Sequence, residues 1–348
     1  MTDQILIRRD GVAGILALNR PQAIHSLTLE MVHAMTAALL EWRDDPAVQV
    51  VILDHATGRG FCAGGDIAEL RESIVNAGGV AARQFFHDEY QLDHLIKTYP
   101  KPFVAFIDGI VMGGGVGISQ PARFRVATEN TRFAMPETGI GLFPDVGGSF
   151  YLARLPHRIG QFLVLTGARL DGAECLWSGL ATDYVPVAAL AEAKRRIAEA
   201  PGEIAAILAD LAVEPPLARI TANADRIERL FAADTLEEIV AALEAEPGDW
   251  AAKERAAIAP KAPLSSKVAL RQLVEGAARD DFADILAMEY RIASRLIMRP
   301  DFAEGVRALI VDKDNAPKWN PATASDVDDA LVDSIFAPLP ANEEWKPL

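Results

Sequence analysis

The chain has 348 residues, half of them apolar, which is enough for one large domain or for one domain with an appendage. Its formal net charge of −15 argues against nucleic acid and anionic membrane as partners, because both would repel an acidic surface. The cysteines are Cys62 and Cys175 alone, too few for a disulfide framework or a cysteine metal site, which is typical of a reducing compartment.

The N-terminal residues MTDQILIRRD contain neither the apolar segment of a secretory signal nor the Arg/Ser-rich stretch of a transit peptide. Elsewhere no apolar run reaches the length of a membrane span. We therefore expect an untargeted, cytoplasmic protein with no membrane partner.

The first half of the chain alternates between strand and helix patterns. Residues 5–19 predict a hairpin that turns at Asp10-Gly11, and Thr28 is a suitable N-cap for the helix that follows. Strands are predicted at 48–53, 103–107, 123–127 and 133–134, a Gly-rich turn at 109–117, a loop at 136–148, and helices from Asp66 and over 81–98, 150–155 and 160–165. This alternation predicts an α/β fold.

From about Ala188 the composition shifts to Ala, Glu and Leu with helical periodicity. Ser265 is a candidate N-cap for one helix, and a second apolar stripe runs from Phe282 to Leu296. The prediction is an α/β core over residues 1–200, followed by a helical C-terminal region over 201–348.

The glycine-rich stretch Gly58–Asp66 follows a predicted strand and contains the pattern GxGxxA of a dinucleotide site. Such a site needs a second strand ending in an acid about 20 residues on, but here the chain enters an amphipathic helix after Gly79. We favour a different use, in which Gly64-Gly65 present backbone N–H groups to a developing oxyanion at a helix N-terminus. A tight turn without a ligand is the alternative.

A second stretch has three consecutive glycines, Gly113–Gly115, after another predicted strand. Three glycines carry a high conformational entropy cost, so they indicate that a substrate or another helix comes close to the backbone. The pattern alone does not separate these two explanations.

Three carboxylates stand in apolar surroundings. Glu137 and Asp145 lie eight residues apart in a loop rich in Gly and Pro, and Glu89 lies on the apolar stripe of its helix. Desolvation would raise their pKa values and suit them to acid, base or nucleophile chemistry. The alternatives are capping roles for the first two and a paired core position for Glu89. The sequence contains no HxxxH or HExxH pair, no GxSxG and no P-loop, which argues against a metal centre and a serine triad.

In their order and spacing, GRGFCAGGDI, DGIVMGGGVGIS and FAMPETGIGLFPDVGGSFYLARL resemble the crotonase (enoyl-CoA hydratase/isomerase) superfamily. The resemblance implies a spiral of ββα units with a helical C-terminal region. It also implies an oxyanion hole for an acyl-CoA thioester, with Gly65 and Gly114 as the donors. No cofactor is expected, since CoA is part of the substrate, and a homo-oligomer stays open.

Within that superfamily the carboxylates resemble those of the 3-hydroxyisobutyryl-CoA hydrolases. Enoyl-CoA hydratases carry a second glutamate at the position of Gly117, whereas Glu137 matches the shared one and Asp145 in LFPDVGG is the hydrolase feature. FFHDEYQLDHLIK places Glu89 at the substrate-contacting acid, and MEYRIASRLIMRPDFAEGVRALIVDKDNAPKW also resembles this subfamily.

The resemblance implies hydrolysis of 3-hydroxyisobutyryl-CoA, or of a close relative such as 3-hydroxypropionyl-CoA, to the free acid and CoA, as in valine catabolism. Glu137 would attack the carbonyl or activate water, Asp145 would position water or shuttle a proton, and Glu89 would hold the 3-hydroxyl. The alternatives are an enoyl-CoA hydratase or isomerase, disfavoured by Gly117, and a non-catalytic acyl-CoA-binding relative, disfavoured by the retained acids. Candidate cations for the CoA phosphates are Arg20, Arg59, Lys97, Lys101, Lys313 and Lys318.

Overall fold

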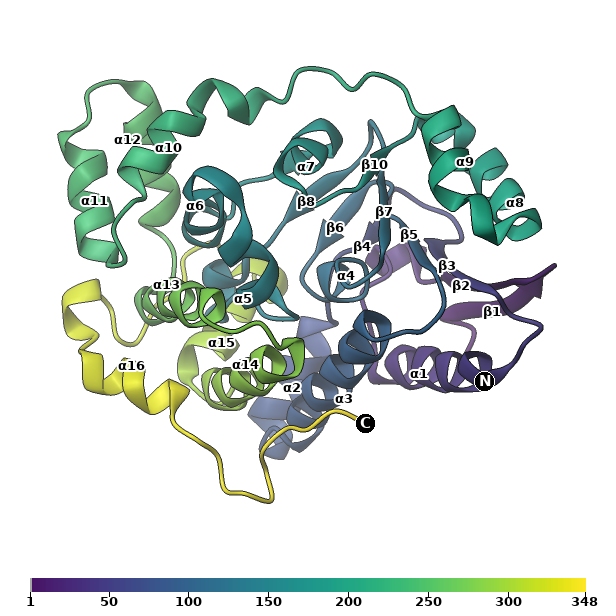
Figure 1. Cartoon of the computed structure of the whole chain (residues 1–348). Helices are drawn as coiled ribbons and strands as arrows, with labels where there is room; N and C mark the ends of the chain where they lie inside the picture. Colours follow the sequence, from purple (N-terminus) through teal and green to yellow (C-terminus); the bar gives the residue numbers. More distant parts are fainter. Residues whose placement is uncertain (1) are drawn as a thin grey trace.

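The computed structural model describes residues 2–348 and contains two sheets that lie next to each other (Figure 1). The larger sheet has the order β1-β2-β3-β5-β7-β10 and the smaller one β4-β6-β8-β9. The strands are β1 (Ile5–Asp10), β2 (Ala13–Leu18), β3 (Val50–His55), β4 (Gly60–Cys62), β5 (Phe103–Phe106), β6 (Ile110–Met112), β7 (Phe124–Ala127), β8 (Arg132–Ala134), β9 (Leu170–Asp171) and β10 (Asp183–Tyr184).

From β3 to β8, consecutive strands alternate between the sheets. β3, β5 and β7 pair in parallel in the larger sheet, and β4, β6 and β8 pair in parallel in the smaller one. Helical segments follow each strand pair, so the chain repeats a ββα unit and winds into a spiral. The predicted fold class is confirmed, since the larger sheet opens with the predicted hairpin and continues in parallel.

Helices cover the sheets and form most of the C-terminal region. They are α1 (Leu29–Asp44), α2 (Ile67–Ala77), α3 (Val80–Lys97), α4 (Gly114–Gly117), α5 (Gly148–Tyr151), α6 (Ile159–Thr166), α7 (Gly172–Ser178), α8 (Leu190–Glu199), α9 (Ile204–Leu211), α10 (Ala224–Leu230), α11 (Leu236–Ala245), α12 (Asp249–Ile258), α13 (Pro263–Ala277), α14 (Phe282–Leu296), α15 (Pro300–Val306) and α16 (Asp329–Phe336). None of the helices in residues 2–348 combines the length and hydropathy that crossing a bilayer requires.

The core lies on both faces of the larger sheet. On one face Ile15 and Ile52 pack with Ile197 of α8 and Ile207 of α9. The other face belongs to a larger apolar cluster that includes α1 and α3 and extends through α13 and α14. The division predicted at residue 200 stays a prediction; α8 and α9, on either side of it, cover the same face of the sheet (Figure 1).

The predictions of N-cap residues were partly correct. Thr28 caps α1 by accepting a bond from the Met31 N–H at 3.3 Å, and Asp66 caps α2. The prediction for Ser265 was wrong, because α13 begins at Pro263 and Ser265 is buried inside it. Proline suits the first position of a helix, where a missing N–H has no consequence.

Short elements account for the other differences between the predicted and the observed secondary structure. Residues 109–117 are not a turn but contain strand β6 and the short helix α4, and the predicted loop over 136–148 contains a 3₁₀ turn, Glu137–Ile140. Strands β9 and β10 were not predicted at all. With two residues each, they are too short to show a period in the sequence.

Candidate active site

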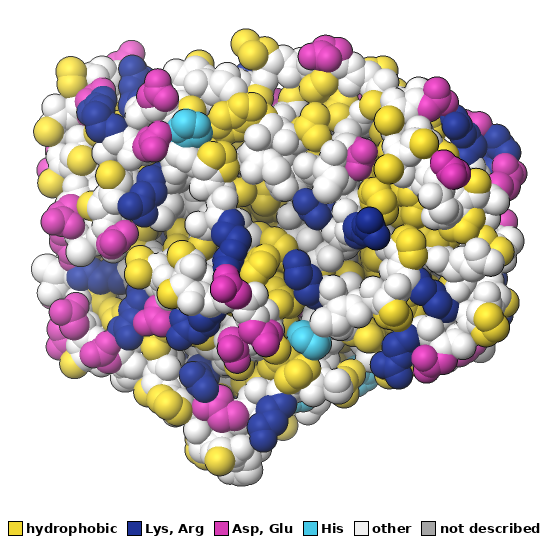
Figure 2. Space-filling view, in the orientation of Figure 1, with side chains coloured by type: hydrophobic (Ala, Val, Ile, Leu, Met, Phe, Trp, Pro, Cys, Tyr) yellow, Lys and Arg dark blue, Asp and Glu magenta, His cyan; other side chains and the backbone are white. Residues whose placement is uncertain are grey.

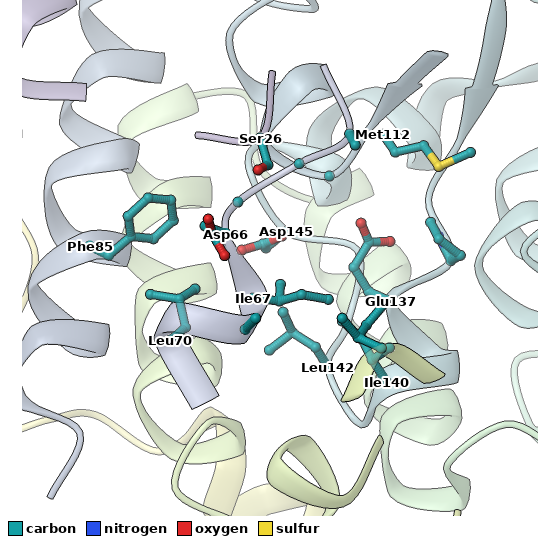
Figure 3. A pocket seen from close by; sticks show the side chains of 18 of the residues that line it. Ser26, Asp66, Ile67, Leu70, Phe85, Met112, Glu137, Ile140, Leu142 and Asp145 are labelled. Atoms are coloured by element: carbon teal, nitrogen blue, oxygen red, sulfur yellow. The ribbon is translucent and has the colours of Figure 1, made fainter. Parts of the chain in front are cut away.

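One cavity of about 380 Å³ brings all five predicted site residues together, Gly65, Glu89, Gly114, Glu137 and Asp145. It lies where strands of the smaller sheet end, since β4 precedes Gly65, β6 precedes Gly114 and β8 precedes Glu137. α3 supplies Glu89, and the loop before α5 supplies Asp145. In Figure 3 the carboxyl groups of Glu137 and Asp145 project into the space between apolar side chains.

The two glycine loops touch each other at the cavity. A Cβ on Gly64 would lie 3.6 Å from the nitrogen of Gly114. Gly64 and Gly113 have φ angles of +107° and +47°, a backbone conformation that other residues rarely adopt. Within residues 2–348 the N–H groups of Gly65 and Gly114 donate to no protein acceptor, so both are free to bind a ligand oxygen.

Burial dominates the electrostatics of the three carboxyl groups, each at most 5% exposed. It raises the pKa of Asp145 to about 7. Burial, together with the neighbouring charge of Asp145, also holds the pKa values of Glu89 and Glu137 well above their usual range. One oxygen of Glu89 and one of Glu137 have no hydrogen-bond partner in the described chain. Asp145 can therefore exchange protons with a ligand near neutral pH.

Three further residues that sequence reasoning missed surround Asp145. The hydroxyl of Tyr90 donates to Asp145 Oδ2 at 2.7 Å. Asp93 is completely buried and neither of its oxygens has a partner in residues 2–348. Glu289 of α14 accepts bonds from the N–H groups of Gly147 and Ser149. Asp93 follows Glu89 on the same helix at a spacing of four, which was the available signal for it, whereas the spacing of one gave none for Tyr90.

The structure explains why position 117 carries no acid. A Cβ on Gly117 would lie 2.7 Å from the Cβ of Val146 and 2.8 Å from Asp93 Oδ2. These distances are shorter than real side-chain contacts, so even alanine would force a rearrangement. The space is already filled by Val146 and by a carboxylate that comes from α3.

The predicted phosphate-binding cations separate into different places. Arg20 lies beside the cavity, because its guanidinium pairs with the lining residue Asp66 at 2.9 Å. Lys97 and Lys101 line a different hollow together with Arg123. No lysine or arginine of residues 2–348 lines the catalytic cavity itself.

The C-terminal region supplies part of the cavity wall. Leu309 and Ile310 line it from a π-helical turn, Arg307–Val311. Sequence reasoning missed them because nothing in an apolar pair shows which distant loop it will face.

A metal fits this cavity poorly, since its only charged lining groups are carboxylates with raised pKa values or paired to arginine. In the described chain, His157, Asp225 and Glu228 have donor atoms within 4.8 Å of one another, but both acids are exposed and the group lies outside the cavity. We assign it no role.

Comparison with known proteins identifies the family. The family model described as enoyl-CoA hydratase/isomerase matches residues 13–336. The chain belongs to this family. Among its relatives, the mitochondrial 3-hydroxyisobutyryl-CoA hydrolases of Gallus gallus and Homo sapiens are 40% and 39% identical over 97% and 98% of this chain, and 90% of each relative is covered. A probable 3-hydroxyisobutyryl-CoA hydrolase of Arabidopsis thaliana is 39% identical over 99% of this chain and 94% of its own.

Solved structures of the enoyl-CoA hydratase/isomerase family share the fold over the whole chain. A carnitinyl-CoA dehydratase from Mycobacterium thermoresistibile has a TM-score of 0.93 and is 39% identical, with 98% of each chain covered. An enoyl-CoA hydratase from Rhodobacter sphaeroides has a TM-score of 0.89, also at 39% identity, with 99% of this chain and all of the other covered. The relatives therefore carry names for different reactions, and the geometry of the site is needed to choose between these reactions.

Proposed function

We propose that this chain hydrolyses the thioester of 3-hydroxyisobutyryl-CoA, or of a close short 3-hydroxyacyl-CoA, to the free acid and CoA. The observation that carries the proposal is the pair of buried acids Glu137 and Asp145 in one cavity, with no room for an acid at Gly117. The names of relatives about 40% identical over nearly the whole chain support the same reaction.

In the proposed mechanism the thioester oxygen binds between the N–H groups of Gly65 and Gly114. These donors stabilise the negative charge that develops as the carbonyl carbon becomes tetrahedral, and one such donor is typically worth about 3 kcal/mol in the transition state. Glu137 acts on the carbonyl carbon, either as the nucleophile or as the base that activates water. Asp145, oriented by Tyr90, positions water or transfers a proton, and Glu89 binds the 3-hydroxyl.

Hydration of an enoyl-CoA is the second candidate, because the two solved structures described above are named a hydratase and a dehydratase. Hydration across a double bond uses two acids that act on adjacent carbons. Here Val146 and Asp93 occupy the space beside position 117, which favours hydrolysis.

The test is release of free CoA thiol from 3-hydroxyisobutyryl-CoA and 3-hydroxypropionyl-CoA, with the absorbance of crotonyl-CoA followed in parallel. We expect thiol release from the 3-hydroxyacyl substrates and little change with crotonyl-CoA. Glu137→Gln should reduce kcat by about 1,000-fold or more, since it removes the group that acts on the carbonyl. Crotonyl-CoA hydration without thiol release would replace this proposal with the second candidate.

We also propose that the protein needs no cofactor beyond the CoA of its substrate and that it is located in the cytoplasm. The charge of −15 supports a small-molecule substrate rather than nucleic acid. Localisation of a fluorescent fusion would test the compartment, since several relatives carry "mitochondrial" in their names.

A further inference from the structure

Asp145 sits in a loop whose backbone is strained. Val146, the next residue, has a φ of +54°, and Gly147 follows with +85°. A left-handed conformation is a genuine outlier for a β-branched residue, and it persists only where the surroundings hold it in place.

Two buried side chains of the C-terminal helices hold this loop. Gln272 of α13 donates from Nε2 to the carbonyl of Pro144 at 2.6 Å, just before Asp145. Glu289 of α14 accepts from the N–H of Gly147 at 2.7 Å and from the N–H of Ser149 at 2.8 Å, just after it. Both side chains are completely buried, so these bonds do not compete with water.

We propose that Glu289, assisted by Gln272, is a positioning residue that fixes the strained loop and thereby the carboxylate of Asp145. Helices α13 and α14 thus support the loop that carries Asp145 without lining the cavity themselves. The inference rests on the proposed function, because it deepens the role of Asp145 in that reaction.

The geometry favours a carboxylate over other side chains at position 289. Two backbone N–H groups converge on two different oxygens, an arrangement that a carboxylate satisfies and that an amide, with one oxygen and one NH₂, cannot. Burial works against the charge and raises the pKa of Glu289 to about 8, while the bonds to Ser149 and Gly147 lower it.

The chain offers a matched control in Glu174. It is also buried and also accepts two backbone N–H groups, those of Asp171 at 2.8 Å and Ile220 at 3.0 Å. It does not line the catalytic cavity. A purely structural role for such carboxylates would give Glu174→Gln and Glu289→Gln the same effects.

The experiment compares kcat, KM and the pH profile of 3-hydroxyisobutyryl-CoA hydrolysis in Glu289→Gln, Glu174→Gln and wild type, each normalised to folded protein. For Glu289→Gln we expect kcat to fall at least about 10-fold with KM changed less than about 2-fold, because a displaced catalytic group affects the transition state more than binding. Glu174→Gln should keep wild-type kcat and pH profile.

The pH profile adds a readout that a structural role would not move. The groups that face Asp145 are Glu89, Tyr90 and Asp93 of α3, together with Glu137 and Glu289. If Glu289→Gln displaces Asp145, that carboxylate loses the bond from Tyr90 that lowers its pKa, so the limb of the profile should shift to higher pH.

Wild-type kcat and an unshifted profile in Glu289→Gln would overturn the inference, as would an equal loss of kcat in Glu174→Gln. If Glu289→Gln does not fold, Gln272→Met tests the same loop, since it keeps the volume but removes the donor to Pro144. Wild-type kcat in that variant would then overturn the proposal. Failure of the wild type to release thiol would instead refute the proposed function, and peptide-level hydrogen exchange over 144–151 would still test whether Glu289 holds the loop.

Discussion

At the scale of single residues, the site depends on acids that the fold buries away from solvent. Burial raises the pKa of Asp145 to about 7, so this group changes charge within the physiological range. The hydrogen bond from Tyr90 opposes that rise in pKa and so favours the ionised form of the carboxyl group. Asp145 is therefore able to act as a base near neutral pH, which is where a catalytic base is most effective.

A pH–rate measurement tests this assignment. Since the ionised form of Asp145 would position or deprotonate water, kcat should rise with pH through a limb near 7. Asp145→Asn should remove that limb and reduce kcat by about 100-fold or more. A wild-type profile that stays flat between roughly pH 5.5 and 8.5 would contradict the role.

The close contact between Gly114 and Glu89 gives a second prediction. A Cβ at position 114 would lie 2.2 Å from Glu89 Oε1 and 3.0 Å from Leu27 Cδ1. Gly114→Ala should therefore displace both the oxyanion donor and Glu89, with a loss in kcat of about 100-fold.

Gly202→Ala is the matched control, because a Cβ there meets no atom within 4 Å. We expect its activity to equal that of the wild type. Equal activity of both variants would show that the Gly114 amide does not bind the thioester.

Much of this residue-level detail was predictable, and the limits have physical causes. The glycine motifs and the acids Glu137 and Asp145 were found because they cluster in short stretches of sequence. Glu289 was recognised only as part of a helical stripe, since its partners lie 142 and 140 positions earlier in the chain. Contacts of that separation leave no local pattern, so Gln272 and Leu309 were missed for the same reason.

At the scale of elements, helix α3 connects the active site to the C-terminal tail. It carries Glu89 and Tyr90 among its buried residues. The tail returns to this helix, where Trp345 donates from Nε1 to the carbonyl of His87 at 3.1 Å and Gln91 donates to the carbonyl of Lys346. The tail is therefore a structural support for the helix that holds two site residues, and Figure 1 shows it crossing beside α3.

Trp345 should account for much of the stability of this arrangement. Its side chain is only 2% exposed, so Trp345→Ala should lower the free energy of unfolding by about 3 kcal/mol through lost packing. Urea denaturation measures the change, and Leu217→Ala, at an 84% exposed position, is the control that should leave stability nearly unchanged. A similar small effect for both variants would mean that the tail is not held by Trp345.

Elements with clear local signals were predicted well, and those that depend on tertiary contacts were not. The Thr28 and Asp66 caps and the long helices α3 and α14 follow from residue type and periodicity. β6, β9 and β10 have two or three residues each and are stabilised by their neighbours in the sheets. The Ser265 cap was wrong because a proline two positions earlier starts the helix.

At the scale of the whole molecule, charge is distributed in two different ways. The face of the molecule in Figure 2 carries acidic and basic side chains in mixed order. In the interior, the buried acids Glu89, Asp93, Glu137, Asp145 and Glu289 lie in or beside the site. Asp93 is the extreme case: it is fully buried, its neighbours include Glu89, Asp145 and Glu289, and no oxygen of it is partnered in residues 2–348. Such a group destabilises the fold once it ionises.

The pH dependence of the destabilisation by Asp93 can be tested. Burial, with the charges of Glu89, Asp145 and Glu289, raises the pKa of Asp93 in the folded protein above its pKa in the unfolded chain. The folded state therefore loses stability as the pH rises above the unfolded pKa. Asp93→Asn should therefore raise Tm relative to wild type at pH 8.5, with a much smaller difference at pH 5. Differential scanning fluorimetry at the two pH values measures this. A Tm lowered equally at both would show that the carboxyl makes a stabilising contact.

The wall formed by Leu309 and Ile310 has a consequence for synthesis of the protein. The cavity includes residues from position 23 to position 310, so a ribosome must release nearly the entire chain before the pocket can close. Until then the apolar lining and the buried acids of a nascent chain remain open to water and to chaperones. A premature stop before residue 300 should yield a product that holds every predicted catalytic residue and still lacks the wall that Leu309 and Ile310 form.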